Sequence, residues 1–376
     1  MKIVLAPDKF KNSITGLEFC IAVEAGINQI RPDVNIVKLP LADGGDGTIE
    51  VVNYYLKGEV INVVVSNPFF EPIQASYLYS EDTKTAFIEM AEASGVKLLD
   101  PHEFDCKNAT TLGTGEMIVD AITKGASKII LGIGGSATND CGIGMATALG
   151  YRFLDKDNLD VKPIGANLSE VRSLDVTNVN PMLNDVEFKI ACDVINPLYG
   201  KNGAAYVYAE QKGASKKDIE ILDKGLESMS KIICGVFNVD AQSVKGAGAA
   251  GGMGIASKVF LKGNLEPGIQ LIKNLADFDN LIKGADWIIT GEGKLDTQTM
   301  SGKTIKGVMS SAKANKIKVA AFCGAIDLEG FNPKDFDISY GDAVMHYAKN
   351  LEDAMVHGGS YVEQIAKKFA SEVLKQ

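Results

Sequence analysis

The segment LGIGGSATNDCGIGMATALG, residues Leu131–Gly150, decides the fold that this sequence predicts. The apolar run Ile129–Leu131 enters a glycine-rich turn and a second apolar stretch follows, a pattern typical of a strand, a turn and a helix. Glycines permit positive φ angles and let a ligand approach backbone N–H groups. The polar cluster Ser136–Asp140 stands where we expect the helix to begin, and helix starts favour anions. The segment therefore predicts a phosphate or nucleotide site.

Strand and helix patterns alternate on the N-terminal side of this segment. The apolar run Lys2–Ala6 predicts a first strand, and Thr15 with Glu18 forms a capping box for a helix. Further strands are expected at Asn35–Lys38 and Val60–Val65, with a helix between them. This βαβαβ order predicts a parallel sheet covered by helices.

The alternation resumes near the C-terminus, with strands expected at Trp287–Thr290, Lys318–Cys323 and Ala343–Tyr347, whereas the middle of the chain shows a different pattern. There the runs Ile73–Tyr79 and Thr85–Met90 predict a hairpin, and Ser66–Pro72 is turn-rich. We therefore expect an α/β fold with two domains. Residues 1–68 and 284–376 would form a discontinuous Rossmann-like parallel-sheet domain, and residues 69–283 an inserted α/β domain.

Composition limits the kind of protein. The 376 residues, 46% of them hydrophobic, can bury a full core, and the formal net charge is −10. Nucleic-acid and anionic-membrane binders usually carry a basic stripe, so neither partner is expected. No apolar run reaches the ~18 residues of a membrane helix, and the N-terminus does not read as a signal peptide, so we expect a cytoplasmic protein. The cysteines and histidines lack the spacing of a zinc site.

Three segments imitate nucleotide signatures. SGKT (Ser301–Thr304) lacks the glycine of a phosphate loop, because Thr297 stands in its place. Gly132–Ala137 satisfies GxGxxA after a strand, and Asp155 could act as the ribose-binding acid, which keeps a dinucleotide interpretation open. The glycines of Gly246–Gly254 follow a poor strand and are better explained by close backbone packing.

Acidic residues follow several predicted strands, at the edge where open α/β sheets bind ligands. A single acidic turn is often only turn chemistry, but three together favour Mg²⁺, which needs one or two carboxylates beside substrate phosphates. The acidic residues are Asp43 and Asp46, Asp193, and Glu292 and Asp296.

A basic turn follows the first strand. PDKFKNS places Asp8, Lys9 and Lys11 at the carboxyl end of that strand. Phosphoryl transfer requires positive charge on the migrating group, a divalent cation on its oxygens and a carboxylate that aligns the attacking hydroxyl. The lysines and aspartates of these turns have the chemistry for that reaction.

Six blocks, in this order along nearly the whole chain, resemble the type 1 glycerate kinase family. The resemblance implies ATP-dependent phosphorylation of D-glycerate with Mg²⁺, and a two-domain α/β fold with the active site in the interdomain cleft. The blocks are APDKFKNSIT (Ala6–Thr15), PLADGGDGT (Pro40–Thr48), GIGGSATNDCGIGMATALG (Gly132–Gly150), CDVINPLYGKNGAAYVYAEQKGA (Cys192–Ala214), GAGAAGGMG (Gly246–Gly254) and ITGEGKLDTQTMSGKT (Ile289–Thr304).

The chemistry of these turns, together with the motifs, leads us to hypothesise a role for each candidate residue. Asp193 would orient or deprotonate the accepting hydroxyl, Lys9 and Lys11 would neutralise the phosphoryl group or the glycerate carboxylate, and Asp43 and Asp46 would hold Mg²⁺. The residues expected to cradle the nucleotide phosphates are Gly134, Gly135, Ser136, Ala137, Thr138 and Asn139. The residues expected to bind substrate are Asp8, Asn196, Lys212, Glu292 and Asp296.

Some positions depart from the family pattern. Asp46 stands where glutamate is common, Asn12 replaces a glycine, and Ala209–Glu210 replaces Gly-Pro. All keep polarity or loop character, so they bear on substrate preference more than on the reaction.

The rival interpretations are an NAD-dependent oxidoreductase of a 2-hydroxy acid, a kinase of another small hydroxy acid and a non-catalytic binder of small anions. The 2-hydroxyl of glycerate is the expected acceptor, and the 3-hydroxyl stays open as an alternative. A homodimer also stays open.

Overall fold

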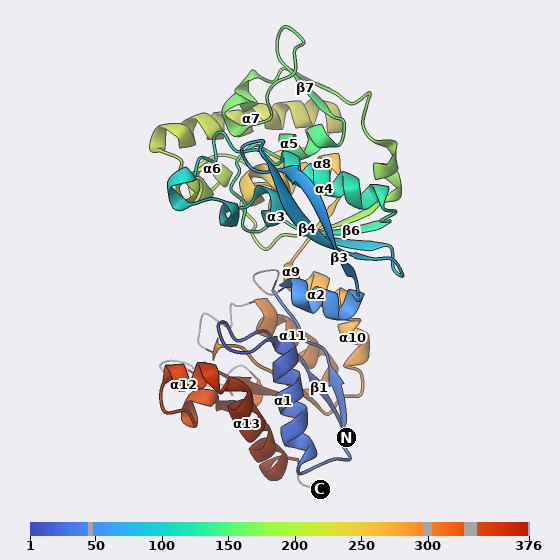
Figure 1. Ribbon diagram of the computed structural model, residues 1–376, viewed down its shortest axis with the longest axis vertical. Coiled ribbons are helices and arrows are strands. Elements are labelled where there is room, and N and C mark those ends of the chain that lie inside the picture. The colour runs from blue at the N-terminus through green and yellow to red at the C-terminus, as the bar shows by residue number, and fades with distance from the viewer. Residues whose placement is uncertain (44–47, 296–302, 327–336, 375–376) are drawn as a thin grey trace. The chain divides into compact units, whose positions relative to one another are not determined.

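The computed structural model of the chain describes residues 1–43, 48–295, 303–326 and 337–374. It is an α/β protein, as predicted, and the chain divides into two compact units (Figure 1). The first unit comprises residues 1–55 and 269–376, and the second comprises residues 56–268. The second unit is therefore an insertion in the sequence of the first. Among the described residues, no helix has the length and apolar character needed to cross a membrane.

The first unit is built on a parallel sheet with the strand order β15-β13-β11-β1-β2. Strand β1 aligns Ile3 with Trp287 of β11 on one side and with Ile36 of β2 on the other. Because all five strands are parallel, their carboxyl ends meet at one edge of the sheet. The strands are β1 (Lys2–Leu5), β2 (Asn35–Lys38), β11 (Trp287–Thr290), β13 (Lys318–Cys323) and β15 (Ile338–Ala343), with a separate pair formed by β12 (Lys294–Leu295) and β14 (Ala325–Ile326).

Helices complete the first unit around an apolar core. Thr15 and Glu18 form the predicted capping box at the start of α1, and α1 packs against α13 so closely that a Cβ on Gly26 would lie 2.3 Å from the Glu363 carbonyl oxygen. The rings of Phe322 and Phe369 lie 5.6 Å apart in this core. The helices are α1 (Gly16–Asn28), α2 (Thr48–Leu56), α9 (Gly268–Leu275), α10 (Phe278–Leu281), α11 (Lys303–Asn315), α12 (Leu351–Val356) and α13 (Gly358–Glu372).

The second unit contains a mixed sheet with the order β10-β9-β6-β5-β4-β3. Strands β5, β6, β9 and β10 are parallel, and β3, β4 and β5 pair antiparallel, which includes the predicted hairpin. The strands are β3 (Glu59–Ser66), β4 (Pro72–Ser80), β5 (Thr85–Glu89), β6 (Lys128–Gly132), β9 (Glu187–Ala191) and β10 (Asn264–Glu266), and β7 (Arg152–Leu154) pairs with β8 (Ser173–Asp175) outside this sheet.

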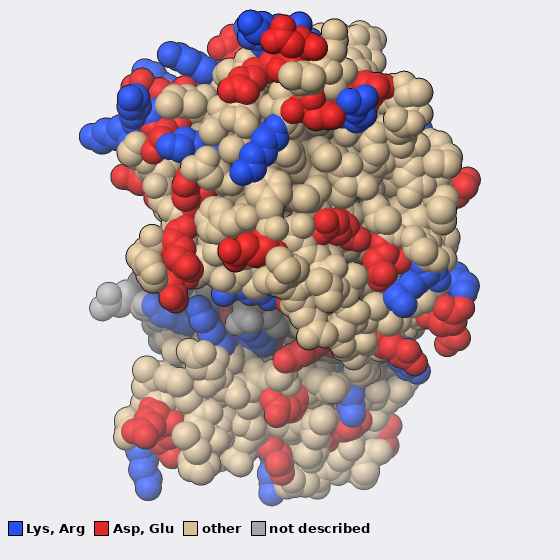
Figure 2. Space-filling model, turned by 45° about the horizontal axis from the view of Figure 1, so that its top comes forward, with Lys and Arg blue, Asp and Glu red and all other residues tan. Residues whose placement is uncertain are grey.

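The helices of the second unit pack on a continuous core of buried apolar side chains. The long helix α7 begins at a second capping box, formed by Ser215 and Asp218. Figure 2 shows acidic and basic side chains interspersed on the face that it draws. Several charged side chains of the second unit form ion pairs, such as Arg152 with Asp160. The helices are α3 (Ala91–Ser94), α4 (Leu112–Thr123), α5 (Ile143–Ala148), α6 (Ala204–Tyr208), α7 (Lys216–Phe237) and α8 (Met253–Phe260).

Two strand predictions were wrong in detail. Val60–Val65 was expected in the parallel sheet of the first domain, but it lies in β3 and pairs antiparallel with β4, because residues 67–71 join these two strands as a hairpin. The unit boundaries consequently lie at 55/56 and 268/269. The strand expected at Ala343–Tyr347 ends at Ala343, because its partner β13 ends at Cys323, directly opposite.

Candidate active site

Predicted site residues of the first unit follow three adjacent strands at the carboxyl edge of its sheet. Asp8 and Lys9 follow β1, Asp43 follows β2 and Glu292 follows β11, and the order β11-β1-β2 makes these strands neighbours. Turns at this edge are where open α/β sheets bind ligands. The fold of this unit therefore brings the three turns together from distant parts of the sequence.

The Asp8 carboxylate at this edge is held between groups that shift its pKa in opposite directions. Burial raises its pKa above the ordinary value, the hydrogen bonds from the Thr304 hydroxyl (2.5 Å) and the Lys9 amide (2.8 Å) lower it, and the negative charge of Asp43 raises it again. Two carboxylates that repel each other at a sheet edge form an oxygen-rich donor pair that suits Mg²⁺. Thr304 was not among the predicted site residues, although the SGKT motif places its hydroxyl in the first turn of a helix.

The other predicted residues of this unit are less constrained. Lys11 is exposed, and the main chain of Glu292 accepts a hydrogen bond from the Gly324 amide at 3.0 Å. Asp46 and Asp296 lie outside the described residues. Within the described ranges, no three His, Cys, Asp or Glu side chains are grouped to hold a metal ion, so a cation here would depend on few protein ligands and on substrate oxygens.

In the second unit, the glycine-rich turn departs from the expected helix start. The helix α5 begins only at Ile143 and has six residues, so Ser136–Asp140 forms a connection rather than a helix N-terminus. Asp140 is fully buried and accepts hydrogen bonds from the Thr111 amide and hydroxyl, both at 2.8 Å, and from the amides of Gly142 and Gly144. Burial raises the pKa of Asp140, and these hydrogen bonds oppose that rise.

The outer part of this turn, Gly134–Ser136, presents unused backbone donors. In the described chain, the amides of these three residues donate to no protein acceptor, whereas the next amide, that of Ala137, donates to the Ser94 carbonyl at 2.9 Å. Gly134 is exposed, has no positive φ and has no atom within 4 Å of a Cβ built on it. Its glycine is thus not required by the fold, and successive free amides suit an anion.

The inner part of the turn rests on the buried ammonium of Lys212. The Lys212 side chain is 6% exposed, and its Nζ donates to the Ser136 hydroxyl at 2.7 Å and to the Thr138 carbonyl at 2.9 Å. Desolvation lowers the pKa of Lys212 to about 8. The hydroxyl of Thr138 and the side-chain amide nitrogen of Asn139 are buried and have no hydrogen-bond partner in the described part of the chain. Lys212, Thr138 and Asn139 thus form a cluster of buried polar side chains next to the amides of Gly134–Ser136.

Asp193 and Asn196 follow β9 in a loop tied to the rest of the second unit. An oxygen of Asp193 accepts a hydrogen bond from the Gly268 amide at 3.0 Å. The Asn196 side chain accepts one from the Tyr208 hydroxyl at 2.7 Å and donates one to the Asn202 carbonyl at 2.9 Å. Asn196 therefore shapes the loop.

The dinucleotide interpretation is wrong, because Asp155 does not follow a strand of the parallel sheet. It follows β7, which pairs antiparallel with β8 outside that sheet, and its carboxylate accepts hydrogen bonds from the amides of Asp157 and Leu159 in a turn.

The packing interpretation of the second glycine block, Gly246–Gly254, is confirmed. A Cβ on Gly251 would lie 2.2 Å from the Thr138 carbonyl oxygen, so this block packs on the first one.

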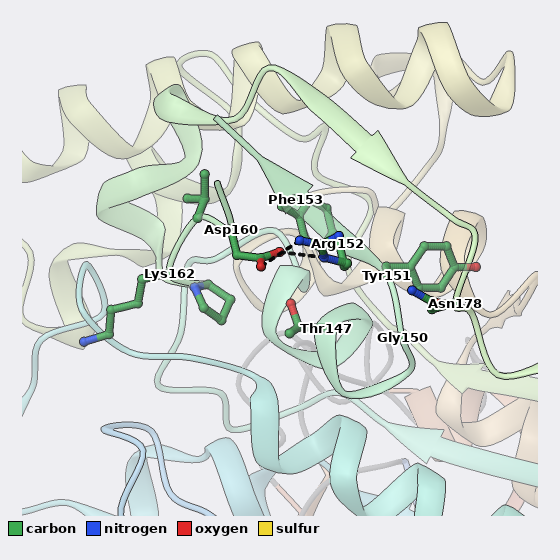
Figure 3. A pocket seen from close by; sticks show the side chains of 10 residues that line it. Thr147, Gly150, Tyr151, Arg152, Phe153, Asp160, Lys162 and Asn178 are labelled. Carbon is green, nitrogen blue, oxygen red and sulfur yellow. Dashed lines mark hydrogen bonds and ion pairs between the residues drawn. The ribbon is translucent and has the colours of Figure 1, made fainter. Parts of the chain in front are cut away.

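A pocket of about 540 Å³ lies elsewhere in the second unit, around β7 (Figure 3). Its wall includes Arg152 and Asp160, which pair with each other, and Lys162. None of the predicted site residues that the structure describes lines it.

Comparisons with known proteins agree with the resemblance drawn from the motifs. The chain matches the glycerate kinase family over residues 3–374. It is 40% identical over 369 residues to a glycerate kinase of Halalkalibacterium halodurans, with 98% of this chain and 97% of the relative covered. It is 41% identical over 326 residues to a glycerate 2-kinase of Escherichia coli, with 87% and 86% covered. A crystal structure described as a glycerate kinase 2 from Salmonella typhimurium LT2 superposes with a TM-score of 0.89 at 38% identity, covering 100% of this chain and 98% of that one.

Proposed function

This chain belongs to the glycerate kinase family and is a kinase that phosphorylates glycerate, and from this premise we propose that it transfers the γ-phosphoryl group of ATP to the 2-hydroxyl of D-glycerate. In that reaction a bond forms between the hydroxyl oxygen and the γ-phosphorus, the bond to the β-phosphate oxygen breaks, and the hydroxyl proton leaves. The products are 2-phosphoglycerate and ADP. The 2-position is supported by the similarity to a glycerate 2-kinase.

The observation that carries the nucleotide part of the proposal is the row of amides at Gly134–Ser136, which donate to no acceptor in the described ranges of the chain. Backbone N–H groups bind phosphate oxygens without regard to the rest of the ligand, and an exposed glycine lets the phosphate approach the main chain. We assign these amides to a phosphate of ATP. Ala137, Thr138 and Asn139 support the turn from beneath, because their polar groups are buried.

Mg²⁺ fits the donor set of the first unit. Asp8 and Asp43 supply two mutually repelling carboxylates, and Mg²⁺ in kinases takes one or two such ligands together with phosphate oxygens. When bound, the ion would offset the charge of the phosphates. Lys9 and Lys11, in the turn after β1, would bind the transferring phosphoryl group or the glycerate carboxylate.

Asp193 is our candidate for the residue that orients the glycerate hydroxyl and takes its proton. One of its oxygens accepts the Gly268 amide, which holds the carboxylate in place. A carboxylate held in this way suits the alignment of a nucleophile in phosphoryl transfer. Glu292 lies in the turn after β11 and would contact substrate.

The direct test is coupled ADP release with D-glycerate, ATP and Mg²⁺, followed by ³¹P NMR of the product. A phosphorus signal coupled to the proton on carbon 2 is expected. Coupling to the carbon 3 protons would overturn the 2-hydroxyl assignment. ADP release with another small hydroxy acid in place of D-glycerate, and none with D-glycerate, would overturn the acceptor.

A further inference from the structure

Lys212 combines full burial with incomplete hydrogen bonding. An ammonium has three donors, and in the described chain Lys212 uses two, to the Ser136 hydroxyl and the Thr138 carbonyl. No carboxylate lies within ion-pair distance of its Nζ among the described residues. A buried cation without a counter-ion is costly, so its presence calls for a functional explanation.

The structure around Lys212 holds the lysine firmly in position. Its main-chain carbonyl accepts the Cys106 amide at 3.1 Å, and the next residue, Gly213, has a φ of +90°. A Cβ on Gly213 would lie 1.9 Å from the Phe104 carbonyl oxygen, so only glycine fits there. The backbone at Lys212 is thus fixed by packing, and its side chain is directed beneath the glycine-rich turn.

Ser136 connects this buried cation to the amides of the glycine-rich turn. Its hydroxyl accepts from Lys212, whereas its own amide and those of Gly134 and Gly135 have no acceptor among the residues that the structure describes. A change at Lys212 would therefore move the amides through Ser136 and through the Thr138 carbonyl. The ammonium would also attract an anion bound to those amides, because buried charges are weakly screened.

We propose that Lys212 is a positioning residue for the nucleotide, which orients the amides of Gly134–Ser136 through Ser136 and Thr138 and supplies a buried positive charge beneath the bound phosphate. This inference rests on the proposed function, in which those amides bind a phosphate of ATP. It differs from the expectation that Lys212 contacts substrate, because both of its hydrogen bonds go to protein groups.

The inference implies a specific pH dependence of ATP binding. The titratable groups that act on Lys212 are Cys106 and Asp140; burial raises the pKa of the Cys106 thiol to about 11, so it stays neutral around pH 8. A bound phosphate favours the charged lysine, so affinity for ATP should be full below the pKa of about 8 and fall as the pH rises through it.

The test is isothermal titration calorimetry of the full chain with ATP and Mg²⁺, without glycerate, between pH 7 and pH 9.5. Lys212→Met should weaken ATP binding by about 10-fold or more at pH 7, the scale of a hydrogen-bonded charge, and should lose the decline above pH 8. Lys212→Arg should recover part of the affinity at pH 7. The control Lys217→Met, at an exposed position, should bind like the parent.

Ser136→Ala provides a variant that keeps the charge and removes only its hydroxyl partner. It should weaken ATP binding about 3- to 10-fold with an unchanged melting temperature, and it tests the inference even if Lys212→Met does not fold. Parent-like ATP affinity and pH dependence in Lys212→Met, or parent-like affinity in Ser136→Ala, would overturn the inference. Because glycerate is absent, a failure of the acceptor assignment leaves this readout intact.

Discussion

The carboxylate of Asp140 accepts two hydrogen bonds from Thr111, one from its amide and one from its hydroxyl, each 2.8 Å long. This contact joins the glycine-rich turn after β6 to the start of α4. Asp140 was expected among the polar residues of a phosphate site, but its oxygens are occupied by protein donors, including the amides of Gly142 and Gly144. It therefore stabilises the turn from within.

Replacement of Asp140 by Asn should destabilise the protein. The new NH₂ group would face N–H and O–H donors in a fully buried site, so we expect the free energy of unfolding to fall by about 2–4 kcal/mol. Urea unfolding followed by circular dichroism measures this change. Asp157→Asn, at an exposed turn, should stay within about 0.5 kcal/mol of the parent, and an equal loss there would contradict the explanation.

Gly134→Ala should separate binding from folding. Since Gly134 has no positive φ and no atom near a Cβ, stability should change by less than about 0.5 kcal/mol. The KM for ATP should rise about 5-fold or more, because the methyl group would stand over the free amides. Gly213→Ala is the matched contrast and should cost about 2 kcal/mol or more in stability. An unchanged KM in Gly134→Ala would remove this residue from the nucleotide site.

Asp193→Asn should lower kcat by about 100-fold or more with little change in melting temperature. The amide oxygen of Asn can still accept the Gly268 amide, so the loop is retained while the proton acceptor is lost. Steady-state kinetics with D-glycerate measure the effect, and the exposed Asp185→Asn is the control. Near-parental turnover would exclude Asp193 as the base.

Metal removal should abolish activity. Excess EDTA is expected to stop ADP release, and added Mg²⁺ to restore it, because the triphosphate needs a divalent counter-ion during transfer. In Asp43→Asn, the Mg²⁺ concentration for half-maximal activity should rise several-fold, since one ligand is lost. Asp82→Asn, exposed in the second unit, should keep the parental requirement. Full activity in EDTA would contradict the assignment.

The carboxylate of Asp342 should make stability depend on pH. Burial alone would raise its pKa, but hydrogen bonds from His346, Tyr347, the Ala343 amide and Lys368 lower it below the ordinary 3.8. A lowered folded pKa gives stability that is present above 3.8 and is lost as the pH falls through the folded value.

Asp342→Asn should therefore cost about 1–3 kcal/mol at pH 7, and the difference from the parent should shrink below pH 3.8. Urea unfolding at pH 7 and at pH 3 measures both values. Asp337→Asn removes an exposed ion pair with Lys313 and should cost less than about 1 kcal/mol at either pH. A constant deficit in Asp342→Asn across this range would contradict the linkage.

Several elements could be predicted because their signals are local. The capping box of Thr15 and Glu18 starts α1, and the apolar run Lys318–Cys323 is β13 with the bounds expected. The hairpin of β4 and β5 could likewise be predicted, because two strand-like runs are joined by a few polar residues. Such features depend on neighbours within a few residues, so propensity and capping are sufficient.

Joint occurrence of six motif blocks determined the family, and with it the α/β class and the kinase activity. Only the tertiary structure decided which residues pair with one another across the fold. It gave β3 to the inserted unit, buried Asp140 against Thr111 and placed Lys212 beneath Ser136. These partners are separated by at least 29 residues in the sequence, except for β3 and its neighbouring strand. Long-range pairing depends on which surfaces remain open after the local elements form, and no local pattern encodes that.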